Sequence, residues 1–123
     1  MIFSLTLQKT TDMLLSFTLS NFRSFKTKKT LDLTAATIKE YEESLFSTGG
    51  LSVLPSAVLY GANSSGKSNL IEAIRTFLTT VYDSASYNSS EELPMSPFMF
   101  DEDSRTKPSC FEIELLIDDD WYR

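Results

Sequence analysis

The chain has 123 residues, a formal net charge of −6, 41% hydrophobic residues and a single cysteine. This length suits one modest domain or part of a larger one. The acidic balance argues against a surface that itself grips nucleic acid, because such a surface needs a basic excess. No segment reaches the roughly 20 apolar residues of a membrane span, so we expect a cytoplasmic protein with no membrane partner.

Cys110 is the only cysteine, and the sequence contains no histidine. An internal disulfide is therefore excluded, and a metal site that uses Cys110 with a histidine is excluded as well. We expect Cys110 to be a structural thiol, buried or half-buried.

The N-terminal part of the chain predicts β-structure. Met1 and Met13 are both candidate starts, so residues 1–12 are a candidate extension. Apolar and hydroxyl residues alternate over residues 15–20, which predicts a strand with one buried face. The alternation resumes over residues 31–33, and the simplest arrangement is two antiparallel strands joined through residues 21–25.

Two further elements are expected before residue 61. Residues 35–48 carry apolar side chains at helical spacing and end at Gly49 and Gly50, which predicts a short helix or an irregular excursion. The apolar run Ala57-Val58-Leu59-Tyr60 is typical of a buried strand.

Residues 61–68 read Gly-Ala-Asn-Ser-Ser-Gly-Lys-Ser and fit the Walker A pattern at every fixed position. In such a loop, consecutive backbone N–H groups enclose phosphates, and a helix N-terminus adds partial positive charge. Lys67 would reach the β- and γ-phosphates of ATP, and the Ser68 hydroxyl would bind Mg²⁺. Gly61 and Gly66 would permit the backbone angles. The predicted nucleotide-contacting residues of this stretch are Gly61, Asn63, Ser64, Ser65, Gly66, Lys67, Ser68 and Asn69.

A helix is predicted directly after this loop, because apolar residues mark one face between Leu70 and Val81. Residues 84–92 are polar and read as a loop, and Pro94 and Pro97 keep the next segment out of regular helix.

The last predicted strand covers residues 111–117, where apolar residues alternate with glutamates to give one buried face. The strand ends at the three aspartates Asp118 to Asp120. Two interpretations of these aspartates are open. One is a hairpin turn with Trp121 and Tyr122 on the return strand. The other is a Walker B strand end, whose carboxylates would bind Mg²⁺ and activate water. The two glutamates fit a central, doubly buried Walker B strand poorly, so the hairpin is favoured.

Two stretches together resemble a known family. They are Leu19-Ser20-Asn21-Phe22-Arg23-Ser24-Phe25 and the loop with its extension Asn69-Leu70-Ile71-Glu72-Ala73-Ile74. The combination is similar to the N-terminal part of ABC-type ATPases of the SMC, RecF and OLD group, and to bacterial AAA-family ATP-binding proteins of phage-defence systems. The resemblance runs from about Met13 to the C-terminus.

The resemblance implies an α/β fold, namely the P-loop NTPase N-lobe of an ABC/SMC head. Residues 13–123 would form an antiparallel β side sheet plus part of a mixed sheet that carries the phosphate-loop helix, as an incomplete domain. Arg23 would lie near the nucleotide phosphates; a solvated turn arginine is the alternative.

The resemblance also implies partners. The remaining C-terminal lobe of the same ATPase would complete the head, two heads would form a homodimer around two ATP molecules, and nucleic acid would bind through parts outside this chain. This sequence departs from the family pattern because it has no Leu-Ser-Gly-Gly signature, no switch histidine and no glutamine after the loop, Gln8 being the only one. No catalytic residue is assigned, and we expect ATP binding without efficient hydrolysis.

Two other functions remain open at this stage. A non-catalytic interaction or regulatory module could descend from such an ATPase and dock a partner through its acidic surface. A P-loop kinase or GTPase is a weaker alternative, because several β-like segments precede the loop and no Asn-Lys-x-Asp sequence occurs.

Overall fold

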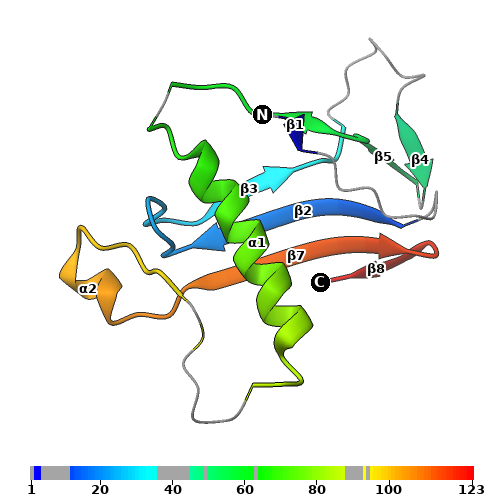
Figure 1. Cartoon of the computed structure of the whole chain (residues 1–123). Helices are drawn as coiled ribbons and strands as arrows, with labels where there is room; N and C mark the ends of the chain where they lie inside the picture. The colour runs from blue at the N-terminus through cyan, green and yellow to red at the C-terminus, as the bar shows by residue number, and fades with distance from the viewer. Residues whose placement is uncertain are drawn as a thin grey trace. The chain divides into compact units, whose positions relative to one another are not determined.

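This computed structural model describes residues 2–3, 12–35, 45–48, 50–62, 64–87, 93 and 95–123 (Figure 1). The chain divides into two compact units. The first comprises Met1–Thr18, Thr30–Tyr60 and Glu112–Arg123, and the second comprises Leu19–Lys29 and Gly61–Phe111. The predicted phosphate loop, residues 61–68, therefore lies wholly within the second unit.

The described elements are six strands, then two helices, then two further strands. They are, in chain order, β1 (Ile2–Phe3), β2 (Met13–Ser20), β3 (Lys29–Asp32), β4 (Phe46–Thr48), β5 (Leu51–Val53), β6 (Ala57–Val58), α1 (Lys67–Asp83), α2 (Glu102–Arg105), β7 (Cys110–Ile117) and β8 (Asp120–Tyr122).

The largest sheet has four strands in the order β3-β2-β7-β8. The Leu33 amide donates to the Leu15 carbonyl at 2.8 Å, and the Thr18 and Thr30 hydroxyls lie 2.8 Å apart. Thr30 lies opposite Thr18 and Leu33 lies opposite Leu15, so residue numbers rise along one strand as they fall along the other. The two strands are therefore antiparallel. This confirms the predicted strand pair joined through residues 21–25.

The β2 strand is buried on both faces, so the expectation of a single buried face was wrong. Ser16 and Thr18 are 7% exposed, as deeply buried as the leucine at position 14, which is 6% exposed. Their hydroxyls remain satisfied because Ser16 donates to a Glu114 carboxylate oxygen at 2.9 Å and Thr18 pairs with Thr30.

The apolar core of the first unit draws on several strands. Its buried members are Leu14, Leu15, Leu33, Val53 and Leu116. The β7 contribution differs from the prediction, since Leu116 is the buried residue of that strand. The alternate residues Ile113 and Leu115 are only partly buried and pack against the same cluster. Both faces of β7 are therefore partly covered.

Two small hairpin-like sheets complete the first unit. The β4 and β5 strands pair antiparallel, from Phe46 opposite Val53 to Thr48 opposite Leu51. The expected helix over residues 35–48 is therefore wrong for residues 46–48, because backbone pairing with β5 competes with helix formation there. Residues 36–44 lie outside the described part of the chain.

The strand before residue 61 is shorter and more exposed than its apolar sequence predicts. The β6 strand covers two residues and pairs antiparallel with β1. Val58 is 44% exposed and Tyr60 is 89% exposed. A two-stranded sheet of two-residue strands has too little area to bury either face. Neither the buried strand nor the expected mixed sheet is present among the described strands, whose assigned pairings are antiparallel.

The second unit is built around α1, which begins at Lys67 as predicted. Ala73 and Ile74 are its buried residues, whereas Leu78 and Val81 at its far end are about half exposed. Among the described residues, no helix is both long and apolar enough to cross a membrane.

Three aromatic rings pack against one another within the second unit. The Phe111 ring lies 5.4 Å from the Phe22 ring in an edge arrangement and 6.3 Å from the Phe77 ring. Pairs at these separations add to apolar burial. The fully buried Phe22 thereby anchors residues 21–25 in the second unit.

The turn between β7 and β8 confirms the hairpin reading of the aspartates. Ile117 pairs with Asp120, which leaves Asp118 and Asp119 as a two-residue connection. Their φ values are +49° and +69°, the pattern of a type I′ hairpin turn.

Cys110 is exposed, so the expectation of a buried or half-buried thiol was wrong. It occupies the first position of β7, where the strand emerges from the connection at Pro108 and Ser109. At the end of a strand, fewer neighbouring side chains cover the thiol.

Candidate phosphate-binding site

Gly66 sets the backbone at the point where the predicted phosphate loop becomes helix. It is the N-cap of α1, with φ at +92° and ψ at 0°. A Cβ atom there would lie 3.3 Å from the Ser24 hydroxyl oxygen and 3.4 Å from the Phe25 ring. Both the left-handed angle and the close approach therefore favour glycine.

Gly61 does not adopt the glycine-specific backbone angle that was predicted. Its φ is outside the left-handed region, where Gly50 and Gly66 are the only glycines described. A Cβ atom at Gly61 would instead lie 2.6 Å from the Ser65 hydroxyl oxygen. A side chain at Gly61 would therefore require the flexible Ser65 hydroxyl to move. Asn63, another predicted contact, lies outside the described residues.

The N-terminus of α1 is open to an anion. No side chain caps it by a hydrogen bond, and its first turn contains no acidic residue. The first amide groups of a helix have no partner within the helix, and they carry the positive end of its dipole. Ser68 is exposed in this first turn. Within the first turn of α1, no carboxylate offsets the positive potential.

The Lys67 side chain folds back over the loop. Its Nζ donates to the Gly61 carbonyl at 2.5 Å, to the Ala62 carbonyl at 2.6 Å and to the Ser65 hydroxyl at 3.3 Å. A full positive charge is therefore held directly beside the loop backbone. An incoming phosphate would exchange neutral carbonyl partners of this ammonium for charged oxygens, which make stronger hydrogen bonds.

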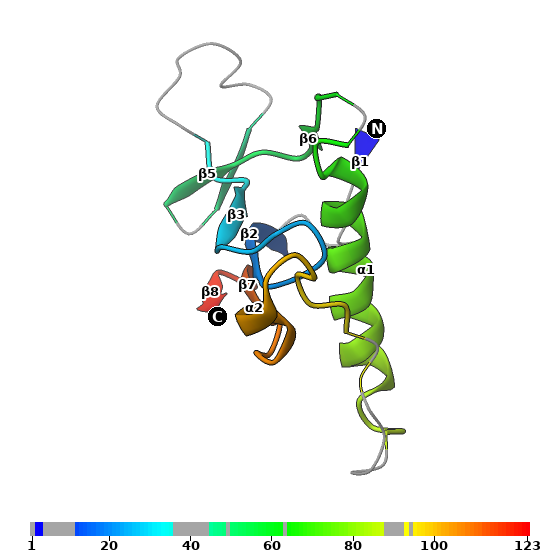
Figure 2. The same ribbon diagram turned by 90° about the vertical axis from the view of Figure 1, so that its left-hand side faces the viewer.

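The turn at residues 21–25 lies against the first turns of α1 (Figure 2). The Asn69 side-chain amide donates to the Ser24 hydroxyl at 2.8 Å. The Arg23 NH2 lies 3.7 Å from Glu72 Oε1. The two sequence stretches that carried the family resemblance are thus brought together within one unit. Asn69, predicted as a nucleotide contact, uses its amide here to hold the turn.

Arg23 is an exposed residue of the turn, and its side chain pairs with α1. Its side chain is 42% exposed, pairs with Glu72 and has its guanidinium carbon 5.7 Å from the centre of the Phe22 ring. Its φ is +48°, and its backbone amide donates to the Ser96 carbonyl at 2.7 Å.

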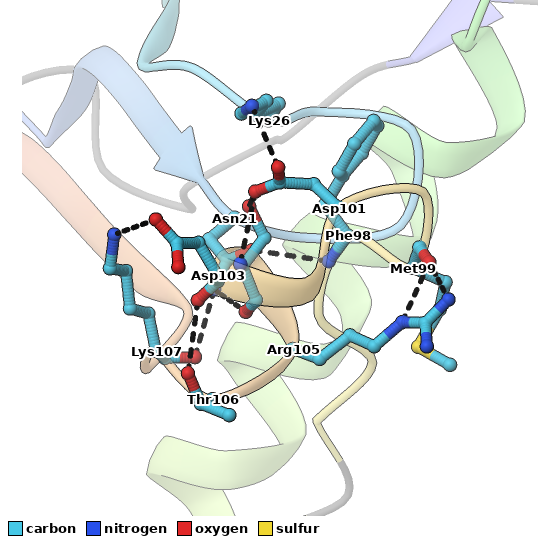
Figure 3. A network of polar contacts seen from close by, with 10 residues as sticks. Asn21, Lys26, Phe98, Met99, Asp101, Asp103, Arg105, Thr106 and Lys107 are labelled. Atoms are coloured by element: carbon cyan, nitrogen blue, oxygen red, sulfur yellow. Dashed lines mark hydrogen bonds and ion pairs between the residues drawn. The ribbon is translucent and has the colours of Figure 1, made fainter.

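Asn21 organises the support behind the turn, and the sequence reading assigned it no role. The residue is 8% exposed. Its Nδ2 donates to the carbonyls of Ser104, Lys107 and Pro108. Its Oδ1 accepts from the Phe98 amide (Figure 3). The available signal was its place directly before Phe22-Arg23-Ser24-Phe25. A short polar side chain there can tie a turn to remote backbone.

Asp101 links the same support to the turn. Its carboxylate accepts from the Ser104 amide at 3.1 Å and from the Ser104 hydroxyl at 2.7 Å, and so caps α2. Lys26 Nζ lies 3.3 Å from the other carboxylate oxygen. The Ser104 hydrogen bonds, followed by Lys26, hold the pKa of Asp101 below its usual value.

Magnesium binding would draw on few protein ligands. Across the described ranges, no group of three or more His, Cys, Asp or Glu side chains is arranged to hold a metal ion. Ser68 supplies an exposed hydroxyl at the helix start. A site of one hydroxyl plus nucleotide oxygens suits Mg²⁺, which keeps several waters and usually binds with substrate phosphates.

Comparison with known families gives a match over the C-terminal part of the chain. A family model described as "AAA domain, putative AbiEii toxin, Type IV TA system" matches residues 56–123. The matched stretch is more than half of the chain and includes residues 61–68, α1 and the β7–β8 hairpin. The turn at residues 21–25 lies outside it. No curated protein and no solved structure gives a significant match.

Proposed function

The chain belongs to this family of AAA domains, and on that premise we propose that it binds Mg-ATP through residues 61–68 as the nucleotide-binding part of an ABC/SMC-like ATPase. The observation that carries the proposal is the joint placement of Gly66 and Lys67. The left-handed Gly66 exposes an uncapped helix N-terminus, and Lys67 holds its ammonium over the preceding loop. Backbone donors and one cation at a helix start suit a phosphate chain.

Each residue of the loop has a separate task in this proposal. The amides at the start of α1 donate to phosphate oxygens, and Lys67 leaves the carbonyls of Gly61 and Ala62 to neutralise charge on the β- and γ-phosphates. Ser68 offers its hydroxyl to Mg²⁺. When bound, Mg²⁺ would supply positive charge that offsets the charge of the phosphates. Arg23 adds a second cation beside the first turns of α1.

Hydrolysis needs further groups in this proposal. The acidic residues 118–120 form the β7–β8 turn, so we do not assign them to water activation. The water-activating carboxylate would come from a C-terminal lobe of the same ATPase, and a second head would complete each nucleotide site. The resemblance of residues 19–25 to ABC/SMC heads supports this arrangement, and the same resemblance supports a role in phage defence.

Equilibrium binding tests the proposal directly. ATP would be titrated into the wild-type chain and into Lys67→Ala, each with Mg²⁺ and with a chelator. We expect saturable binding by the wild type, a loss of at least tenfold in Lys67→Ala, and weaker wild-type binding without Mg²⁺. Equal ATP affinity of the two proteins would contradict the proposal. Tight binding of a protein partner that ignores nucleotide and survives Lys67→Ala would instead favour the non-catalytic interaction module.

A further inference from the structure

Glu72 lies between two arginines, Arg23 in the turn and Arg75 on α1. One carboxylate oxygen, Oε1, lies 3.7 Å from Arg23 NH2, and the other, Oε2, lies 3.5 Å from Arg75 NH1. The Glu72 side chain is 33% exposed, which is less than either arginine. The three side chains together carry one net positive charge, so the carboxylate does not make this surface repel an anion.

The backbone of Arg23 has little freedom to move. The amides of Phe22 and Phe25 each donate to the other residue's carbonyl, at 2.9 and 2.8 Å, which closes the turn. The Arg23 amide itself is bonded to Ser96. Since the backbone is fixed and the Phe22 ring lies 5.7 Å from the guanidinium carbon, the direction of the long side chain depends on its charged partner. That partner is Glu72.

Glu72 is one helical turn beyond the start of α1. Ser68 and Glu72 are four residues apart and so share a face, with an offset of about 6 Å along the axis. The neighbouring Ser24 contacts Asn69, and its hydroxyl oxygen would lie 3.3 Å from a Cβ atom at Gly66. The pair of Arg23 and Glu72 is therefore next to the helix N-terminus and on the side covered by the turn.

We propose that Glu72 is a positioning residue that holds the Arg23 guanidinium beside the first turn of α1, where it serves the terminal phosphate of ATP. The inference rests on the proposed nucleotide binding. The Arg23 NH2 group lies toward Glu72 and the Arg23 side chain is 42% exposed, so the guanidinium is accessible to an anion from solvent. The planar guanidinium suits this double use, because its five donors point in fixed directions.

A double-mutant cycle on the full chain tests this assignment. The affinities for ATP and ADP would be measured for the wild type, Glu72→Gln, Arg23→Ala and the double variant, with Arg75→Gln as the matched control. Arg75 is the other partner of Glu72 but is 72% exposed. Unfolding midpoints of each variant would exclude general loosening as the cause.

We expect Glu72→Gln to weaken ATP binding by about two- to fivefold, the scale of a partly exposed ion pair. ADP binding should stay unchanged, Arg75→Gln should bind both nucleotides normally, and Glu72→Gln should have no further effect once Arg23 is alanine. Unchanged ATP affinity in Glu72→Gln, an equal loss for ADP, or a persisting effect in the Arg23→Ala background would overturn the assignment.

The same binding measurements also test the proposed function, independently of the role of Glu72. If the wild type binds ATP and Lys67→Ala does not, the loop binds nucleotide whatever Glu72 does. If the wild type binds no ATP, the proposed function fails, and the role of Glu72 fails with it.

Discussion

The Asn69 side-chain amide donates to the Ser24 hydroxyl at 2.8 Å, across 45 positions of sequence. Asn69 is in the first turn of α1, and Ser24 is in the turn that follows β2. This hydrogen bond joins the two sequence stretches whose combination resembles one ATPase family. The hydrogen bond thereby holds the turn beside the N-terminus of α1.

Removing either partner of this bond should have the same effect. Ser24→Ala and Asn69→Ala should each lower the free energy of unfolding by about 0.5–1.5 kcal/mol, the net worth of one hydrogen bond. The double variant should cost little more than one single change, because both remove the same interaction. Urea denaturation measures all three proteins, and fully additive losses would show that the two residues act independently.

Asn21 should be the most sensitive polar position of the second unit. Asn21→Ala leaves the Phe98 amide and three backbone carbonyls without this partner. We expect a loss of about 2–4 kcal/mol in the free energy of unfolding, because buried polar groups become unsatisfied and φ at this position is +50°.

Asn21→Gly separates the two causes of that loss. Glycine adopts the positive φ without strain, so the remaining loss in Asn21→Gly reports the hydrogen bonds plus about 0.5–1 kcal/mol for the greater unfolded-state entropy of glycine. Urea denaturation again gives the values. If Asn21→Gly were as stable as the wild type, the hydrogen bonds would contribute nothing net.

Gly66→Ala should cost more than Gly50→Ala. Both positions have left-handed φ, at +92° and +77°, but a Cβ atom at Gly50 meets nothing within 4 Å whereas one at Gly66 approaches Ser24 and Phe25. We expect about 1 kcal/mol for Gly50→Ala and about 2–3 kcal/mol for Gly66→Ala. Thermal unfolding compares the two variants. Equal costs would mean that the turn yields freely to a side chain at Gly66.

The pH dependence of the second unit should reflect Asp101. The Ser104 hydrogen bonds and Lys26 lower the folded-state pKa of Asp101 below the ordinary value of 3.8. A lowered carboxyl pKa stabilises the fold fully above the unfolded value, and the stabilisation is lost as pH falls below 3.8 through the folded pKa. An NMR titration of the Asp101 carboxyl carbon should give a midpoint under 3.8. A midpoint at or above 3.8 would show that the cap and the ion pair do not form in solution.

The β7–β8 turn should accept the standard type I′ sequence. Replacing Asp118 by Asn and Asp119 by Gly should raise the free energy of unfolding by about 0.5–1 kcal/mol, because both residues have positive φ. Nucleotide affinity should not change. A loss of Mg²⁺-dependent ATP binding in this variant would instead assign these aspartates to the metal, as the Walker B reading requires.

The sequence predicted local features well where one short-range rule determines them. Helix α1, the β2–β3 pair and the hairpin at residues 118–119 follow from apolar spacing, a polar break and a run of turn residues. Cys110, β6 and the segment at residues 46–48 were misjudged, because their burial or pairing depends on which strands cover them. Spacing along one strand carries no such information.

The hydrogen bonds that hold the candidate site in place could not be predicted from the sequence. A Walker A pattern locates Lys67 and Ser68, but nothing in it shows that Lys67 folds onto the carbonyls of Gly61 and Ala62. The contacts of Asn21 with residues 98–108 also join segments about 80 positions apart. Such long-range hydrogen bonds depend on tertiary packing, which composition and periodicity do not specify.

The most direct test of the central claim is an NMR measurement of the loop itself. Backbone amide shifts of residues 61–70 would be followed while Mg-ATP is added to the wild type and to Lys67→Ala. Binding at the loop predicts large, saturable shifts at Gly66, Lys67 and Ser68 in the wild type, and much weaker ones in the variant. No shift in these amides at saturating ATP, or the same titration in both proteins, would contradict nucleotide binding by residues 61–68.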